Sequence, residues 1–212
     1  MTMQAQTRGE EIANSVSHGV GVLLAVAAVP VLIVGAVRRG TAADIVGASV
    51  FGAAMVLMYL TSTLYHALPA GRSKQVFQVL DHSAIFLMIA GTYTPFTLGV
   101  PFGGWGWTLF GLVWGVAAAG IVLKAVAGIR FKLLSTLMYV AMGWLIVIAI
   151  KPLLATMEPA GLLWLLAGGL AYTLGAAIYA VKGVRYSHFV WHLFVLAGSA
   201  CHFVAVLGYS SA

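Results

Sequence analysis

The chain has 212 residues, of which 62% are hydrophobic and only 8% are charged. A water-soluble domain of this length carries roughly a quarter charged residues, so the composition excludes an ordinary soluble fold and indicates an integral membrane protein. The formal net charge of +6 does not indicate nucleic-acid binding, because the basic residues are scattered thinly through short segments between apolar runs.

Seven apolar runs are each long enough to cross a bilayer as a helix, which takes about 20 residues. In chain order they cover residues 17–37, 44–67, 77–99, 105–124, 132–151, 160–181 and 187–208. The runs are too long for the strands of a β-barrel and lack period-two alternation. We therefore predict an all-α membrane protein. A short polar segment, residues 1–16, precedes a single seven-helix transmembrane domain over residues 17–212. Within it, the small residues Gly111 and Gly115, four apart, are expected to let helices approach closely.

Lysine and arginine prefer the cytoplasmic side of a membrane. If the N-terminus is inside, the cytoplasmic segments hold Arg8, Arg72, Lys74, Lys124, Arg130, Lys132, Lys182 and Arg185. The opposite side then holds Arg38, Arg39 and Lys151. The imbalance predicts a cytoplasmic N-terminus and a C-terminus outside.

Ionisable and polar side chains gather at the ends of the spans that face the cytoplasm in this orientation. They are Glu11, Asn14 and His18 of the first span, Ser62 and His66 of the second, Asp81 and His82 of the third, and His188 and His192 of the seventh. Residues far apart in the sequence therefore lie at one level of the bundle. His202 lies ten residues, or about 15 Å of helix rise, beyond His192, and this depth argues against a role for it in metal binding.

The spacing of these residues suggests a metal site. Ser62 and His66 are four residues apart, as are His188 and His192, so each pair shares one helix face. Asp81 is the only carboxylate that we place inside a span. Ionisable groups in a membrane normally face the bundle interior and have a partner. Three imidazoles from two helices and a carboxylate from a third are a suitable partner set for a divalent metal.

Zinc is one divalent ion that such a set can bind. Three protein ligands leave its fourth position for water, and bound zinc lowers the pKa of that water toward about 7. Asp81 would orient the water, accept its proton or brace a ligand, and Ser62 would form a hydrogen bond close by. Two alternatives stay open at this point. The histidines would be solvated or bonded to backbone at the span ends, or Asp81 and the histidines would relay protons without a metal.

Four stretches resemble a known family. They are EEIANSVSHGVG at 10–21, STLYH at 62–66, LDHSAIFLMIAGTYTP at 80–95 and SHFVWHLFVLAGSACHF at 187–203. The last three resemble the progestin and adipoQ receptor family, and the first resembles its bacterial branch, called hemolysin III. The motifs occur in order on the expected spans and cover nearly the whole chain. The broader superfamily includes alkaline ceramidases.

The resemblance implies seven transmembrane helices, a cytoplasmic N-terminus and a zinc ion held by His66, His188 and His192. It also places the aspartate of the third-span motif at Asp81 and the serine at Ser62, which we take as the catalytic residues. In the adiponectin receptors this arrangement is associated with hydrolysis of the amide bond of ceramides. The expected function is thus a zinc-dependent hydrolase of a lipid amide or ester in a bacterial plasma (inner) membrane. The alternative is a non-enzymatic homeostasis, sensor or hemolysin-type protein with a structural zinc.

The chain departs from the receptor pattern in two respects. His82 follows Asp81 where receptor members tend to carry tyrosine, and adjacent helical residues point about 100° apart, so His82 is not expected at the metal. The segment before the first span is too short for a regulatory domain, and we expect no extracellular domain that could capture a protein hormone. A membrane lipid is therefore the expected partner, and a protein hormone is not.

Glu11, Asn14 and His18 lie nearly on one helical stripe. They are candidate accessory residues that cap the cavity or assist catalysis. Alternatively, Glu11 and Asn14 satisfy backbone amides at a helix start.

Overall fold

The computed structural model describes residues 6–100, 103–181 and 183–210. These residues form helices and no strand. The elements are α1 (Arg8–Arg39), α2 (Ala42–Ala67), α3 (Arg72–Gly99), α4 (Gly104–Ala127), α5 (Lys132–Gly143), the 3₁₀ helix η1 (Leu145–Ala149), α6 (Ile150–Thr156), α7 (Pro159–Ala180) and α8 (Ser187–Tyr209). Counting α5, η1 and α6 as one, seven helical segments in the described chain are long and apolar enough to cross a membrane. The predicted all-α membrane fold is confirmed.

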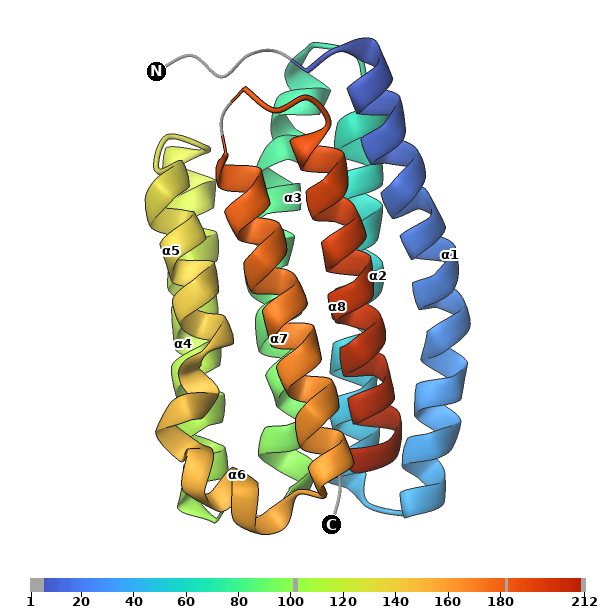
Figure 1. Ribbon diagram of the computed structural model, residues 1–212, viewed down its shortest axis with the longest axis vertical. Helices are drawn as coiled ribbons and strands as arrows, with labels where there is room; N and C mark the ends of the chain where they lie inside the picture. The colour runs from blue at the N-terminus through green and yellow to red at the C-terminus, as the bar shows by residue number, and fades with distance from the viewer. Residues whose placement is uncertain (1–5, 101–102, 182, 211–212) are drawn as a thin grey trace.

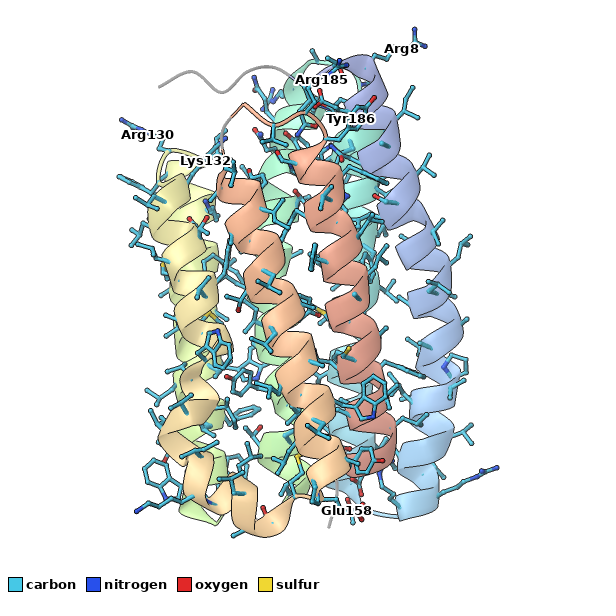
Figure 2. All side chains as sticks on the ribbon, viewed as in Figure 1. Arg8, Arg130, Lys132, Glu158, Arg185 and Tyr186 are labelled. Atoms are coloured by element: carbon cyan, nitrogen blue, oxygen red, sulfur yellow. The ribbon has the colours of Figure 1, made fainter. Side chains whose placement is uncertain are left out.

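The long helices run side by side along the long axis of the molecule, and α1 begins at the end opposite to the one at which α8 ends (Figure 1). Arg8, Arg130, Lys132 and Arg185 lie at the end where the chain begins, whereas Glu158 lies at the other (Figure 2). We call the first of these the N-terminal end of the bundle. The prediction of a cytoplasmic N-terminus depends on this uneven distribution of basic residues between the two ends of the bundle.

Helix α1 begins at Arg8, well before the predicted span over 17–37. Thr7 caps it. The Thr7 hydroxyl accepts a hydrogen bond from the Glu10 backbone N–H at 3.3 Å, and the Glu10 carboxylate accepts one from the Thr7 N–H at 2.8 Å. Such a capping box satisfies two backbone donors that a helix start leaves open. The segment we predicted as a polar lead over 1–16 is therefore helical from Arg8, and residues 1–5 lie outside the described part.

The fifth span is interrupted where the apolar pattern predicts a continuous helix over 132–151. Helix α5 ends at Gly143, and η1 follows it. Tyr93 of α3 bridges the break: its hydroxyl donates to the Gly143 carbonyl at 2.9 Å and accepts from the Ile146 N–H at 3.0 Å. Backbone groups at membrane depth must be satisfied by protein. The break is thus stabilised by a residue of another helix, which the local sequence does not reveal.

At the opposite end of the bundle, Asp44 fastens the turn between α1 and α2. Its carboxylate lies 3.3 Å from Arg39 Nε, and its backbone N–H donates to the Thr41 hydroxyl at 3.1 Å. Arg39 also donates to the Leu207 carbonyl at 2.8 Å, which ties this turn to the end of α8. Asp44 lies within α2 and is 2% exposed. The expectation that Asp81 is the only carboxylate inside a span was therefore wrong.

Helices α2 and α3 approach closely at glycines. A Cβ atom at Gly47 would lie 2.6 Å from Pro95 Cα, and one at Gly91 would lie 2.6 Å from Ala54 Cβ. At Gly111 and Gly115, which we expected to serve helix packing, an added Cβ atom would meet no atom of the described residues within 4 Å beyond their own stretch of helix. Close packing of α2 on α3 matters for the site, because these helices carry Ser62, His66 and Asp81.

Replacing Gly47 with valine should therefore lower the stability of the protein, by about 1–3 kcal/mol if the overpacking resembles that of other cores. The matched change Gly111→Val adds the same side chain where there is room for it, and should leave the unfolding temperature in detergent nearly unchanged. Equal unfolding temperatures for the two variants would contradict the proposed close contact.

Candidate metal centre

Three histidines meet at the N-terminal end of the bundle. His66 lies in the last turn of α2, and His188 and His192 lie in the first turns of α8. One nitrogen of each ring lies within 4.8 Å of the others. The ring centroids are separated by 4.9 Å for His66 and His188, 5.2 Å for His66 and His192, and 4.7 Å for His188 and His192. The three imidazoles are close enough to converge on one metal ion.

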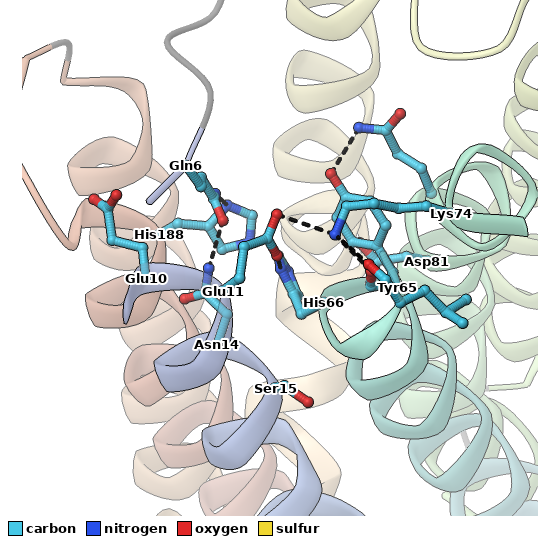
Figure 3. A network of polar contacts seen from close by, with 12 residues as sticks. Gln6, Glu10, Glu11, Asn14, Ser15, Tyr65, His66, Lys74, Asp81 and His188 are labelled. Atoms are coloured by element: carbon cyan, nitrogen blue, oxygen red, sulfur yellow. Dashed lines mark hydrogen bonds and ion pairs between the residues drawn. The ribbon is translucent and has the colours of Figure 1, made fainter. Parts of the chain in front are cut away.

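The ring of His66 is oriented by Glu11 of α1. The distance from His66 Nδ1 to Glu11 Oε2 is 2.7 Å, and Figure 3 shows Glu11 between His66 and Lys74. An ionised carboxylate can only accept, so Nδ1 carries the hydrogen and Nε2 of the neutral ring keeps its lone pair. Nε2 is buried and has no hydrogen-bond partner in the described structure. A buried lone pair of this kind fits a metal ligand, since an unpaired buried polar atom is otherwise unfavourable.

His192 is oriented in the same way by the backbone of α1. Its Nδ1 lies 3.2 Å from the Asn14 carbonyl and 3.1 Å from the Ser17 hydroxyl. The Ser17 hydroxyl donates its own hydrogen to the same carbonyl at 2.9 Å. Because a carbonyl only accepts, His192 Nδ1 is the protonated nitrogen, and Nε2 is left as the available ligand atom.

His188 is contacted by the side-chain amide of Gln6, whose Nε2 lies 3.0 Å from His188 Nδ1. Gln6 is in turn bonded to Asn14 at 2.8 Å. The oxygen and nitrogen of the Gln6 and Asn14 side-chain amides can be exchanged by rotating each amide by half a turn. In that orientation both hydrogen bonds reverse, so that His188 Nδ1 donates to Gln6 and its Nε2 is free to bind a metal. Sequence reasoning missed Gln6 and Ser17, because a single polar residue on a polar helix start carries no distinguishing signal.

The candidate accessory residues divide into two roles. Glu11 and Asn14 contact the rings of His66 and His192, as described above. His18 instead stacks on His192, with centroids 3.5 Å apart and planes 7° from parallel. Both His18 nitrogens are buried without a hydrogen-bond partner among the described residues. His18 does not belong to the group of three nitrogens that can share an ion.

Lys74 and Glu10 join the elements around the centre. The Lys74 ammonium lies 3.0 Å from Glu11 Oε1, and it donates to the carbonyls of Tyr65 and Leu68 at 3.0 and 3.2 Å. The Glu10 carboxylate accepts from the backbone N–H of Tyr186, just before α8, at 2.9 Å. These contacts tie α1 to α2, α3 and α8 at the level of the three histidines.

A cavity of about 160 Å³ opens on the inner side of the histidines. Ser62, Asp81, His188 and His192 line it near the centre, and His202 lines it deeper in the bundle. Ser62 and Asp81, from neighbouring helices, both border this part of the cavity. Most of the remaining wall is apolar, formed by side chains such as Met58, Ile85, Met88, Ile89, Val140 and Val195. The cavity therefore places a carboxylate and a hydroxyl beside the three imidazoles and an apolar space behind them.

His82 also lines the cavity but is held away from the histidine group. Its Nδ1 is 2.8 Å from the Gln78 carbonyl, and it lies 3.8 Å from Asp81. Asp81 itself is not one of the grouped ligand atoms either. Its place is beside the centre, where it lines the cavity together with Ser62.

Residues 6–203, which include every side chain of this centre, match the family described as Haemolysin-III related. The chain belongs to this family. It is 48% identical over 200 residues to the Hemolysin-3 homolog of Bacillus subtilis (strain 168), covering 94% of each chain. It is 46% identical over 209 residues to the Hemolysin-3 of Bacillus cereus, covering 99% of this chain and 95% of that protein.

The likeness extends beyond bacterial members of the haemolysin-III family. The human Monocyte to macrophage differentiation factor is 25% identical over 166 residues, which cover 76% of this chain and 68% of that protein. The resemblance to a haemolysin III branch, which the sequence motifs indicated, is thereby confirmed.

The contact between Glu11 and His66 predicts that Glu11→Ala weakens metal binding by roughly 10- to 100-fold, the usual effect of removing a carboxylate that orients a histidine ligand. The control change Glu158→Ala removes an exposed carboxylate at the opposite end of the bundle (Figure 2). It should leave the metal affinity close to that of the unmodified protein. Competition with a zinc chelator measures both affinities, and an unchanged value for Glu11→Ala would argue against this orientation of His66.

Proposed function

We propose that this haemolysin-III family protein is a zinc-dependent membrane hydrolase that cleaves an amide or ester bond of a lipid. The observation that carries the proposal is the buried, unpartnered Nε2 of His66, which lies beside two further imidazoles. A carboxylate and a hydroxyl face the cavity at the same level. Zinc suits three imidazole ligands with one open position.

Zinc held by His66, His188 and His192 would supply a Lewis acid and a water of lowered pKa. Asp81, which lines the cavity beside them, would accept a proton from the attacking water and return it to the leaving nitrogen or oxygen. Ser62, which lines the cavity beside Asp81, would donate its hydroxyl hydrogen to the developing oxyanion. Overall, water adds across the bond: the acyl group gains OH, and the amine or alcohol leaves with H.

A lipid is the proposed substrate because the cavity lies among membrane-spanning helices and is largely apolar. We further propose that the N-terminal end of the bundle faces the cytoplasm of a bacterial inner membrane. The crowding of Arg8, Arg130, Lys132 and Arg185 at that end (Figure 2) supports this orientation under the positive-inside rule.

A second candidate function is non-enzymatic, and the name Hemolysin-3 of the two bacterial relatives favours considering it. In that case the metal would hold α2 and α8 together in a sensor, a homeostasis factor or a lytic protein. The two functions differ in what Asp81 does. A structural metal needs only the three histidines, whereas hydrolysis also needs a proton acceptor beside them.

The change Asp81→Asn distinguishes the hydrolase from the protein with a structural metal. It should leave zinc bound, since Asp81 is not among the grouped ligand atoms. It should also lower the release of fatty acid from a susceptible lipid amide or ester by about 100-fold or more, the usual contribution of a general base. The matched control is Asp44→Asn, the same chemical change at the far end of α2, with activity expressed per zinc-loaded protein.

The decisive measurement is fatty-acid release from a panel of lipid amides and esters by purified, zinc-loaded protein. Absence of product from every lipid would contradict the hydrolase proposal. Equal activity of Asp81→Asn and unmodified protein would contradict the role given to Asp81.

A further inference from the structure

The deep end of the cavity contains a second polar position, His202 of α8. It follows His192 by ten residues, so the two lie about 15 Å apart along the helix axis, yet both line the same cavity. A cavity that connects a polar centre to one distant imidazole through apolar walls has the shape of a site for a chain-like molecule. His202 is 7% exposed.

The ring of His202 is held in one orientation. Its Nδ1 lies 2.8 Å from the Gly198 carbonyl, and one face stacks on Tyr172 with centroids 5.2 Å apart and planes 15° from parallel. Gly168 of α7 leaves room for the ring, since a Cβ there would come within 2.4 Å of its atoms. Three separate contacts therefore fix the direction in which Nε2 points.

This arrangement leaves Nε2 as a hydrogen-bond acceptor. Because the Gly198 carbonyl can only accept, Nδ1 carries the hydrogen, and Nε2 of the neutral ring has a lone pair. A protonated ring is disfavoured at this depth in a membrane, and no acidic side chain of the described chain pairs with it. Nε2 makes no hydrogen bond to the described residues, and unlike His66 Nε2 it is not enclosed by protein.

Neighbouring hydroxyl groups are already engaged with the protein. The hydroxyls of Tyr59 and Tyr172 lie 2.7 and 3.0 Å from the Ser199 hydroxyl, and that of Tyr93 bridges the break after α5. None of these three groups needs a ligand to satisfy it. His202 therefore differs from them in presenting an open acceptor to a largely apolar space.

We propose that His202 forms a subsite for a hydrogen-bond donor, a hydroxyl or amide N–H, in the middle of a long apolar chain whose polar end lies at the three histidines. The assignment of the polar end rests on the proposed function. The subsite itself requires only that such a chain binds, whether or not it is hydrolysed. It would let the protein prefer lipids hydroxylated within the chain over plain ones.

The test uses ligands without a hydrolysable bond, so that it does not depend on catalysis. They are octadecanol and two octadecanediols, one with its second hydroxyl in the middle of the chain and one with it beside the first. Dissociation constants for purified, zinc-loaded protein are measured by displacement of a fluorescent fatty alcohol. The mid-chain diol should bind about five- to tenfold more tightly than octadecanol, the ratio expected for one net hydrogen bond, and the adjacent diol should show no such gain.

His202→Phe keeps an aromatic ring for Tyr172 to stack on but removes the acceptor. It should abolish the preference for the mid-chain diol while leaving octadecanol affinity and zinc content unchanged. His202→Gln, which retains an acceptor, should keep part of the preference. The control Tyr59→Phe removes a nearby hydroxyl that does not line the cavity, and should keep the full preference.

Equal affinities of unmodified protein for the three alcohols would overturn the subsite, and this comparison does not depend on any variant folding. Failure of all three to bind would overturn the chain-binding cavity as well. A preference that survives in His202→Phe would assign recognition to another group. A clear preference in a protein that hydrolyses no lipid would support the subsite and contradict only the proposed hydrolase.

Discussion

The hydrogen bond between Glu11 and His66 sets the chemistry of the centre. His66 Nδ1 lies 2.7 Å from Glu11 Oε2 and carries the hydrogen of this bond. Nε2 of the same ring therefore keeps a buried lone pair, which no protein group satisfies among the described residues. Burial makes an unpaired polar atom unfavourable, and a metal ion shared with His188 and His192 would relieve that cost at His66. The backbone of Asn14 does for His192 what Glu11 does for His66. Helix α1 thus orients two of the three candidate ligands of α2 and α8 without supplying one itself.

That role explains the length and polarity of α1. Its first turns stand beyond the apolar part of the span, where the capping box of Thr7 and Glu10 stabilises a helix start that hydropathy alone does not support. Lys74 neutralises Glu11 from the opposite side at 3.0 Å, and Glu10 fastens the entry to α8. The contacts form a polar layer across one end of the bundle, and the cavity begins on its inner side.

Much of this could be predicted from the sequence, because the membrane imposes strict rules. The lengths of the apolar runs located the spans. The four-residue spacing put Ser62 on one helix face with His66, and His188 on one face with His192, and their positions at span ends put all four at one level of the bundle. The rest depended on contacts between distant segments. Gln6 and Ser17 touch ligand histidines only through tertiary packing, and the break after Gly143 exists because Tyr93 of another helix satisfies its backbone. Asp44 was missed because a buried carboxylate beside Arg39 and a span-end carboxylate in water look alike in sequence.

Elemental analysis of the purified protein, compared with a variant in which His66, His188 and His192 are all replaced by alanine, tests the central claim most directly. If the three imidazoles grip one ion through their Nε2 atoms, the unmodified protein carries one zinc per chain after purification, and the variant carries none while remaining folded and membrane-inserted. Equal metal content in the two proteins would contradict the claim, and with it the chemistry proposed for Asp81 and Ser62.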